Sequence, residues 1–421
     1  MLIHSAAQLI TVSGPPQRGA DLGGLGIIQD GAVLLKDDRI AEVGSSAELL
    51  AAHPEEPQLD ASGKVVLPGF IDPHTHAVWA GDRAAEFELR LAGKTYLEIL
   101  QAGGGIISTV RSTRQANLAE LVRQTKARLW EMFYHGATTV EVKTGYGLET
   151  ETELRMLEAI LHLDDQGPWD LVPTFLGAHA VAPEFKDDPD GYTEHVCTEM
   201  LPAVAHWWTK NGGGRRFPYV DVFCETGAFN LEQSRRILGT AKDIGFQLKI
   251  HADEFDNLGG ASLAVELGAA SADHLVCTSD ADIAALGEGD TVAVGLPGTP
   301  FGLAHHDYTP AKKILEANGI LAIASDLNPG TTWCENMQMT IAIACRYMQI
   351  TPAQAIAAAT INAAAAVGLA EEVGSLEPGK QADLLVLNVP DYRHLGYRYG
   401  TNLVHTVVKQ GAAYPRPGYS S

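Results

Sequence analysis

Five of the 15 histidines in this 421-residue sequence lie just after short apolar segments with the composition of β-strands: His74, His76, His179, His251 and His274. His74 and His76 are separated by a single residue. In an extended segment their side chains therefore lie on the same face, where both imidazoles can bind one metal ion. A lone His-x-His pair is a weak signal, because two solvated loop histidines would show the same spacing.

His251 and Asp326 lie just after two later apolar segments and make the signal more specific. Three imidazole nitrogens and one carboxylate oxygen form a donor set typical of Zn²⁺ or Fe²⁺/Fe³⁺, with one coordination position left open for water. We therefore predict one metal ion per chain, bound by His74, His76, His251 and Asp326. Both zinc and iron remain open, because this donor set suits either metal.

The elements that must position these residues are apolar, β-branched segments that alternate with long helical stretches through the middle of the chain. Eight such segments are present, at residues 65–71, 138–142, 171–175, 220–223, 247–250, 271–273, 292–294 and 320–324. Eight parallel strands close a (β/α)₈ barrel. An open doubly wound sheet is the alternative, but no Gly-x-Gly-x-x-Gly motif follows the first segment. We therefore predict an α/β fold with a (β/α)₈ TIM-type barrel.

Barrel enzymes carry their chemistry at the carboxyl ends of the strands, so the residues that follow each strand should share one face. Further polar residues follow the second to the sixth segments, namely Lys143, Tyr146, His179, Glu225, Glu254 and His274. Glu254 lies three residues after His251, which is close enough for general acid/base work beside the metal. Its neighbour Asp253 should point the other way in an extended segment. Lys143 is interpreted as a structural ion-pair partner rather than a catalytic amine.

The two chain ends differ from the middle of the chain, because both contain short β-like segments separated by turns. Asp37 and Asp38 can form the turn of a hairpin, and further apolar strands follow residue 382. We predict a small β-sandwich domain built from residues 1–64 and 374–421, with the barrel at residues 65–373. The most apolar run, residues 355–370, is too short to cross a membrane and is interpreted as one buried helix.

The charge balance narrows the choice of partners. The chain has 30 basic and 52 acidic residues, a formal charge of −22, which argues against nucleic-acid binding through a general positive surface. An anionic ligand must then be bound by a local cation. No basic leader precedes an apolar segment, and the five cysteines form no Cys-x-x-Cys motif. We therefore expect a cytoplasmic protein that binds neither membranes nor nucleic acids.

Six segments resemble the amidohydrolase superfamily and, within it, the imidazolonepropionase family, along nearly the whole chain. They lie at residues 68–76, 81–83, 101–106, 143–147, 251–255 and 325–331. The resemblance places the ligands of one metal on the four residues predicted above. It places substrate contacts on Arg83, Tyr146, His179, Glu254, Asn328, Gly330 and Thr331. Two-metal members usually have a modified lysine at the end of the fourth strand, where this chain has Phe223-Cys224-Glu225, so one metal is expected.

The resemblance implies a reaction in which a metal-activated water hydrolyses the cyclic C–N bond of 4-imidazolone-5-propanoate. The product is N-formimidoyl-L-glutamate, and this is the third step of L-histidine degradation. Glu254, His274 and Asp326 are the candidate catalytic residues, and the division of the acid/base roles among them stays open. Arg83 is the expected partner of the substrate propionate, because a guanidinium group binds a carboxylate through two hydrogen bonds.

Two alternative functions fit the sequence less well. Another one-metal amidohydrolase, such as a purine or pyrimidine aminohydrolase, is disfavoured by Arg83 and by the turn from Asn328 to Thr331. A non-catalytic binding protein with a structural metal would leave Glu254 and the open coordination position without a purpose. The expected partners are a small anionic substrate and a second copy of the chain, because symmetric dimers are the commonest oligomers.

Overall fold

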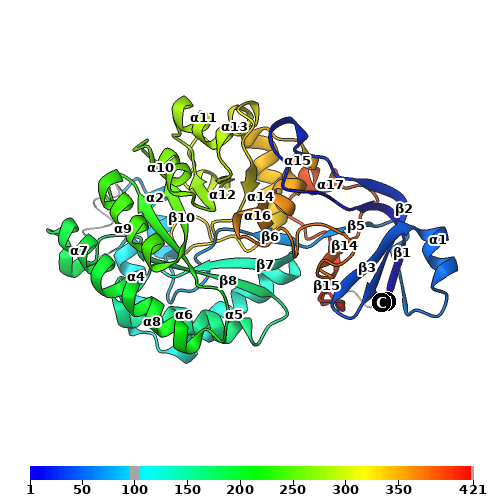
Figure 1. The fold of residues 1–421 in the computed structure, drawn as a ribbon, viewed down its shortest axis with the longest axis horizontal. Coiled ribbons are helices and arrows are strands. Elements are labelled where there is room, and N and C mark those ends of the chain that lie inside the picture. Colours follow the sequence, from blue (N-terminus) through cyan, green and yellow to red (C-terminus); the bar gives the residue numbers. More distant parts are fainter. Residues whose placement is uncertain (95–103, 419–421) are drawn as a thin grey trace.

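The computed structural model describes residues 1–94 and 104–418, which form a parallel barrel and a separate mixed sheet. Figure 1 shows the barrel with its helices on one side and the small sheet on the other. The predicted α/β fold with a (β/α)₈ barrel is confirmed. Residues 101–103, which belong to one of the segments behind the family resemblance, lie outside the described residues.

The barrel strands run in sequence order around the sheet. They are β6 (Phe70–Asp72), β7 (Ala137–Lys143), β8 (Asp170–Ala178), β9 (Tyr219–Cys224), β10 (Gln247–Ala252), β11 (Ser271–His274), β12 (Val292–Gly295) and β13 (Leu321–Ile323). Neighbouring strands pair in parallel, and β7 and β12 are buried along their whole length. Strands covered on both faces favour apolar side chains, which makes most of these strands apolar segments in the sequence. The fully buried β7 also contains Glu141 and Lys143.

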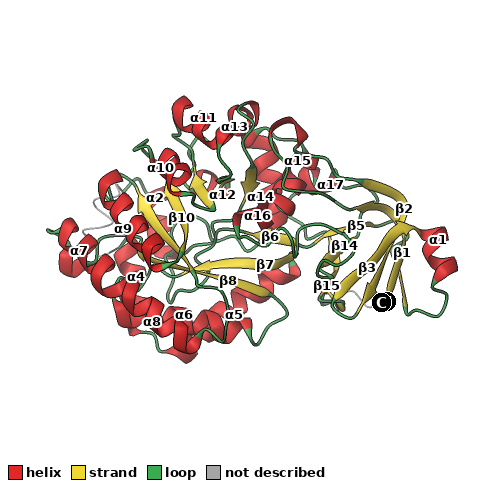
Figure 2. Ribbon diagram, in the orientation of Figure 1, coloured by secondary structure: helices red, strands yellow, loops and turns green. Residues whose placement is uncertain are grey.

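Helices surround these strands, as Figure 2 shows in red around the yellow sheet. The first half of the barrel carries α2 (Ala84–Leu91), α4 (Ile106–Gln115), α5 (Leu118–Tyr134), α6 (Thr150–Asp164), α7 (Pro189–His195), α8 (Leu201–Asn211) and α9 (Leu231–Ile244). The second half carries α10 (Gly260–Leu267), α11 (Asp280–Glu288), α12 (Gly298–Gly302), α13 (Ala311–Glu316), α14 (Met337–Ile343), α15 (Pro352–Ala358) and α16 (Ile361–Ala366).

The first predicted strand, residues 65–71, is divided at Gly69. Val65–Pro68 (β5) pairs with β1 and β14 in the small sheet, and only β6 belongs to the barrel. A Cβ atom at Gly69 would lie 2.2 Å from Oγ1 of Thr138, so only glycine lets the chain pass this close to β7. The prediction of one barrel strand was wrong here, because a continuous apolar run does not reveal a change of sheet. The domain division at residues 64 and 373 stays a prediction.

The small sheet joins both chain ends in the order β16-β15-β14-β5-β1-β2-β3, with β4 also paired to β1. Its strands are β1 (Leu2–Ile10), β2 (Ile27–Lys36), β3 (Arg39–Ser45), β4 (Gln58–Asp60), β5, β14 (Leu384–Leu387), β15 (Val404–Lys409) and β16 (Ala412–Pro415). Two short helices, α1 (Ser46–Ala52) and α17 (His394–Tyr397), complete the chain ends. The predicted hairpin turn at Asp37 and Asp38 is confirmed between β2 and β3.

The apolar run at residues 355–370 is buried but does not form the single helix that was predicted. It is divided between α15 and α16 at Thr360, whose φ and ψ of −126° and −98° are not helical. The hydroxyl of Thr360 donates to the carbonyl of Ile356 at 2.7 Å, a local bond that competes with the helical pattern. Among the described residues no helix is long and apolar enough to span a membrane.

The barrel closes between β6 and β13 through the segments that follow these two strands. The backbone N–H of Asp326 donates to the carbonyl of His74 at 3.1 Å, and that of His76 donates to the carbonyl of Leu327 at 2.9 Å. Below them, the N–H of Ser325 donates to the Asp72 carboxylate at 3.0 Å. The seam of the barrel therefore fixes the His-x-His segment and Asp326 against each other.

A buried lysine forms ion pairs that join the small sheet to the barrel. Lys409 Nζ in β15 lies 2.5 Å from Asp170 Oδ2 at the start of β8 and 2.6 Å from Asp383 Oδ2 beside β14. Removing a buried cation leaves its carboxylates uncompensated, so we expect Lys409→Met to lower the free energy of unfolding by about 3 kcal/mol. Urea denaturation measures this loss.

The matched control is Lys313→Met, because Lys313 pairs with Asp280 in an exposed ion pair. Exposed pairs contribute at most about 1 kcal/mol, so this variant should unfold close to the unmodified protein. Equal unfolding midpoints for the two variants would contradict the attachment by Lys409.

Candidate active site

A cavity of about 700 Å³ opens at the carboxyl ends of the barrel strands. Its lining includes the predicted residues His76, Arg83, Tyr146, His179, His251, Glu254, His274, Asp326, Asn328, Gly330 and Thr331. His74, the remaining predicted residue, is fully buried beside them, and its ring centroid lies 4.4 Å from that of His251. The fold therefore brings all the predicted site residues to one place.

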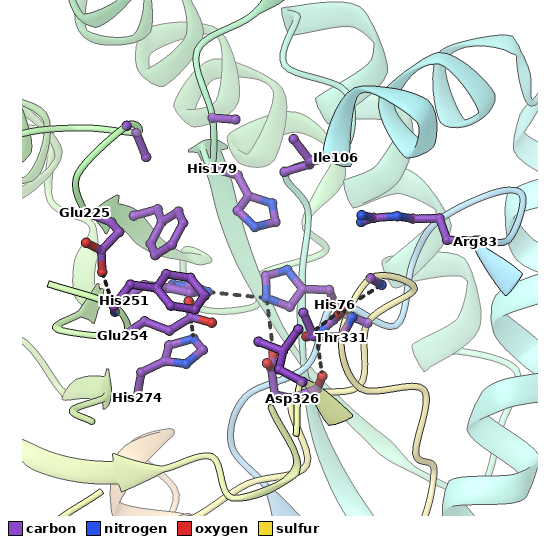
Figure 3. Close-up of a pocket in the computed structure, with 18 of the residues that line it drawn as sticks. His76, Arg83, Ile106, His179, Glu225, His251, Glu254, His274, Asp326 and Thr331 are labelled. Atoms are coloured by element: carbon purple, nitrogen blue, oxygen red, sulfur yellow. Dashed lines mark hydrogen bonds and ion pairs between the residues drawn. The ribbon is translucent and has the colours of Figure 1, made fainter. Parts of the chain in front are cut away.

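The predicted metal ligands converge in this cavity. Nε2 of His74 lies 3.5 Å from Oδ1 of Asp326, and Nε2 of His76 lies 3.6 Å from the same oxygen. Nε2 of His251 lies 3.3 Å from Nε2 of His76. Figure 3 shows His76 and Asp326 facing each other near the middle of the pocket, with His251 beside them.

The donors fit a metal ion. Three overlapping groups of three residues could each hold a metal ion, because the ligand atoms within each group lie within 4.8 Å of one another. Together the groups contain the four predicted ligands, His179 and His274. Among the described residues, Nε2 of His74 is a buried nitrogen without a hydrogen-bond partner. A neutral imidazole nitrogen left bare inside a protein is costly unless it has a partner, and a cation supplies one. Which four of these residues bind the metal stays a prediction.

Two aspartates orient the buried histidines from below. Oδ2 of Asp273 lies 2.6 Å from Nδ1 of His74, and Oδ2 of Asp221 lies 2.9 Å from Nδ1 of His251. These contacts leave Nε2 of each ring for the pocket. Burial, with Lys143 nearby, holds the pKa of His74 well below 6.5, so this imidazole is neutral and able to bind a metal.

Sequence reasoning missed both aspartates. Asp221 and Asp273 lie inside β9 and β11 rather than after them, and both are fully buried. A carboxylate within an otherwise apolar strand was the available signal, because such a group needs a buried partner. Lys143 is that partner for Asp221, at 2.8 Å, which agrees with its interpretation as a structural residue.

Glu254 and His274 form the acid/base side of the pocket. Oε2 of Glu254 lies 3.6 Å from Nε2 of His274. Burial raises the pKa of Glu254 well above 4.5, and the carboxylates of Asp326 and Glu225 add to the rise. Glu225 also accepts hydrogen bonds from the backbone N–H groups of Phe255 and Asp256, at 2.9 and 3.1 Å, and so holds the loop that carries Glu254.

Asp253 differs from its predicted geometry. Its φ of +57° lies in the left-handed region, so the chain turns here instead of continuing as an extended segment. Its side chain is buried, and Oδ2 accepts a hydrogen bond from the Thr278 hydroxyl at 2.8 Å. Asp253 thus anchors the turn after β10.

Arg83 lies at the start of α2 on the other side of the pocket. Figure 3 shows its guanidinium group opposite Glu254 and His274, with His76 between them. Nε and Nη2 of Arg83 lie 2.9 and 2.8 Å from Oε2 of Glu86, which fixes the direction of the side chain. A Cβ atom at Gly330 would lie 2.4 Å from Nη1 of Arg83, so this glycine makes room for the guanidinium group.

Tyr146 lines the pocket from the loop after β7, and His179 lines it from the end of β8. Glu153 accepts hydrogen bonds from the N–H groups of Gly145, Gly147 and Leu148, at 3.0, 2.7 and 2.8 Å, and so shapes the loop around Tyr146. Burial raises the pKa of Tyr146, which therefore keeps its proton as a donor.

His179 is oriented by the same loop. Its Nδ1 lies 3.1 Å from the carbonyl of Gly145, and its ring stacks on His76 with centroids 4.7 Å apart. Burial lowers the pKa of His179 to about 3, so the ring is neutral. With a proton on Nδ1 donated to that carbonyl, Nε2 is left as an acceptor.

Asn328 shapes the turn that closes the pocket. Its side-chain oxygen accepts from the N–H groups of Gly330 and Thr331, both at 2.8 Å. Its amide nitrogen donates to the carbonyl of Asp326 at 2.8 Å. These bonds hold the turn, and the residues of the turn still line the cavity.

Comparison with known proteins agrees with this geometry. A model described as the amidohydrolase family matches residues 65–413, and one described as a bacterial imidazolonepropionase-like composite domain matches residues 31–55. Among solved structures, guanine deaminase of E. coli has a TM-score of 0.74 at 17% identity, covering 99% of both chains. A zinc-containing adenosine deaminase from Xanthomonas campestris has a TM-score of 0.71 at 18% identity, covering 98% of this chain and 92% of its own. This chain therefore belongs to the amidohydrolase family and has the fold of these deaminases.

Curated relatives identify the family within the amidohydrolases to which this chain belongs. An imidazolonepropionase of Herpetosiphon aurantiacus is 53% identical over 99% of this chain and 97% of its own length. One from Geobacillus kaustophilus is 45% identical over 99% of this chain and 98% of its own length. This chain belongs to the imidazolonepropionase family.

We predict that the purified protein binds one metal ion per chain and that chelation abolishes its hydrolytic activity. Substituting His251 with alanine removes one of four ligands and should sharply weaken metal binding. Elemental analysis after dialysis measures the metal content. A His251→Ala protein that keeps its metal and its rate would contradict the predicted ligand set.

Proposed function

We propose that this chain hydrolyses the cyclic C–N bond of 4-imidazolone-5-propanoate to give N-formimidoyl-L-glutamate, the third step of L-histidine degradation. Curated relatives named imidazolonepropionase, 44–53% identical over nearly the whole chain, support this reaction. The structural observation that carries it is the placement of Arg83 opposite Glu254 and His274 across the histidine cluster. An anionic tail and a reacting ring can then be held in one pocket at the same time.

His74, His76, His251 and Asp326 would hold the metal, which is zinc or iron in this proposal. When bound, a metal ion at such a site lowers the pKa of water to about 7 and polarises the carbonyl that is attacked. The hydroxyl of Thr299 donates to Oδ2 of Asp326. This bond leaves Oδ1 of Asp326 facing the imidazoles of His74 and His76.

The reaction requires one proton to move between water and a ring nitrogen. Water oxygen bonds to the ring carbonyl carbon, the ring C–N bond breaks, and the departing nitrogen takes a proton. The carboxylate form of Glu254 can accept the proton from water, and the resulting carboxyl can deliver it to the nitrogen. The raised pKa of Glu254 makes its carboxylate the stronger base for the first transfer. His274 lies beside Glu254 and can polarise the carbonyl, and Asp326 can assist the first transfer.

The substrate propionate would bind on the Arg83 side of the pocket. Glu86 holds one edge of the guanidinium group, and Nη1 points toward the turn at Gly330. The Tyr146 hydroxyl is a second donor for the carboxylate. His179, Asn328, Gly330 and Thr331 would contact the ring or the product. Charge-assisted bonds to a carboxylate are among the stronger polar contacts in proteins.

The cellular setting is also part of the proposal. We place the enzyme in the cytoplasm, where thiols stay reduced, and all five cysteines are free in the structure. A small anionic substrate and a homodimer complete the proposed partners.

The direct test is turnover of 4-imidazolone-5-propanoate by the metal-loaded protein. Loss of the imidazolone chromophore should accompany stoichiometric formation of N-formimidoyl-L-glutamate. Guanine and adenosine serve as competing substrates, because relatives of the same fold deaminate them. Deamination of guanine or adenosine without imidazolone turnover would overturn the proposal.

We predict that Arg83→Met raises KM for the imidazolone substrate by about 10- to 150-fold, because a charge-assisted pair contributes roughly 1.5–3 kcal/mol. Arg83→Lys should restore only part of the affinity, since the two-pronged geometry is lost. Steady-state kinetics with an analogue that lacks the carboxylate provide the control. If the unmodified enzyme turns over that analogue as well as the true substrate, Arg83 has another role.

We predict that Glu254→Gln lowers kcat by about 10²- to 10⁴-fold while the metal stays bound, because the shape is kept and the proton-transfer group is lost. Asp253→Asn is the matched control. Its side chain contacts Thr278 instead of lining the pocket, so kcat should fall much less. Single-turnover rates with parallel metal analysis separate the two variants. An unchanged kcat in Glu254→Gln would transfer the role to His274 or Asp326.

A further inference from the structure

A group of five charged side chains is buried beneath the pocket, on four strands of the barrel. Its members are Glu141 and Lys143 on β7, Asp221 on β9, Lys249 on β10 and Asp273 on β11, each at most 1% exposed. The proposed mechanism uses none of them directly. Burying this much charge is costly, so the arrangement calls for a specific reason.

Lys143 lies between the two aspartates that orient histidines. Its Nζ lies 2.8 Å from Oδ2 of Asp221 and 3.7 Å from Oδ2 of Asp273. Those same oxygens lie 2.9 Å from Nδ1 of His251 and 2.6 Å from Nδ1 of His74. One ammonium group on β7 therefore connects a pair on β9 and β10 with a pair formed by β11 and the segment after β6.

The remaining two charges hold this arrangement in place. Oε1 of Glu141 lies 2.7 Å from Nζ of Lys143 and 3.2 Å from Nζ of Lys249. Lys249 donates to the carbonyl of Pro73 at 2.7 Å, directly before His74 in the chain. Glu141 and Lys249 thus fix the position of Lys143 and of the segment that carries the His-x-His pair.

We propose that Lys143 is a positioning residue that couples the two aspartate–histidine pairs and so sets the distance between Nε2 of His74 and Nε2 of His251. The proposal rests on the proposed metal ligands, which include both histidines. Without the ammonium group, the carboxylates of Asp221 and Asp273 repel each other inside the barrel, and each carries its histidine with it. Loss of such supporting groups typically weakens metal binding about 10- to 100-fold.

The first test compares two buried lysines that each bridge two aspartates. Lys143→Met should weaken Zn²⁺ and Co²⁺ binding by at least about 10-fold in competition with a chelator, and should alter the visible absorption spectrum of bound Co²⁺. Lys409→Met removes the equivalent bridge between Asp170 and Asp383 in the small sheet. It should lose stability but keep the metal affinity and the spectrum of the unmodified protein.

Lys143→Arg adds a conservative variant. A guanidinium group keeps the charge but changes its shape, so Co²⁺ affinity should recover in part while the spectrum stays altered. If Lys143→Met matches Lys409→Met in both affinity and spectrum, the proposal is wrong.

The second test measures the coupling between the two aspartate–histidine pairs directly. It does not need the Lys143→Met protein, so it still tests the proposal if that variant fails to fold. Asp221→Asn and Asp273→Asn are made singly and together, and the Co²⁺ affinity of each protein is measured. Because Lys143 links the two pairs, the first substitution disturbs both histidines. The fold loss of Co²⁺ affinity in the double variant should then be smaller, by a factor of at least about 3, than the product of the fold losses in the two single variants. Losses that simply multiply would overturn the coupling.

These readouts separate this inference from the proposed function, because metal binding is measured without substrate. A protein that shows the coupling but does not hydrolyse the imidazolone would overturn the function alone. A protein that hydrolyses the imidazolone with independent, multiplying losses would overturn the coupling alone.

Discussion

The neutralisation of buried charge inside the barrel is the constraint on which the rest of the site depends. Asp221 and Asp273 orient His251 and His74 as buried carboxylates, and a nearby cation offsets the cost of burying their charge. Lys143 supplies that cation between them. The neutral imidazoles then present Nε2 to the pocket, where a metal ion can be bound without first rearranging the chain.

Backbone hydrogen bonds also position the predicted metal ligands at the carboxyl ends of the strands. The barrel closes through hydrogen bonds between the segments that carry His74, His76 and Asp326, so closure of the fold and assembly of the ligands are one event. Loops then add the groups that handle substrate. Glu225 and Glu153 each accept several backbone N–H bonds and hold the loops of Glu254 and Tyr146. A rigid set of strands thus supports the loop residues that line the pocket.

The rim residues were predictable because side chains after parallel strands must meet at one edge, and the family resemblance assigned their roles. The supporting residues were not. Asp221 and Asp273 lie within strands, where a carboxylate indicates a buried partner without identifying it. Glu153 lies inside α6, where only the three-dimensional contacts reveal its role. The two errors in the fold share a cause as well. The chain passes between sheets at Gly69 and a helix ends near Thr360, and both changes fall inside apolar runs. An apolar run predicts that residues are buried, but it does not show where the backbone changes direction.

The most direct test of this account is an anomalous-scattering map from crystals of the metal-loaded protein. We predict one peak per chain, about 2.0–2.2 Å from Nε2 of His74, His76 and His251 and from a carboxylate oxygen of Asp326. The contacts from His74 to Asp273 and from His251 to Asp221 should persist. A peak bound by His179 or His274 in place of these ligands, or two peaks per chain, would contradict the account.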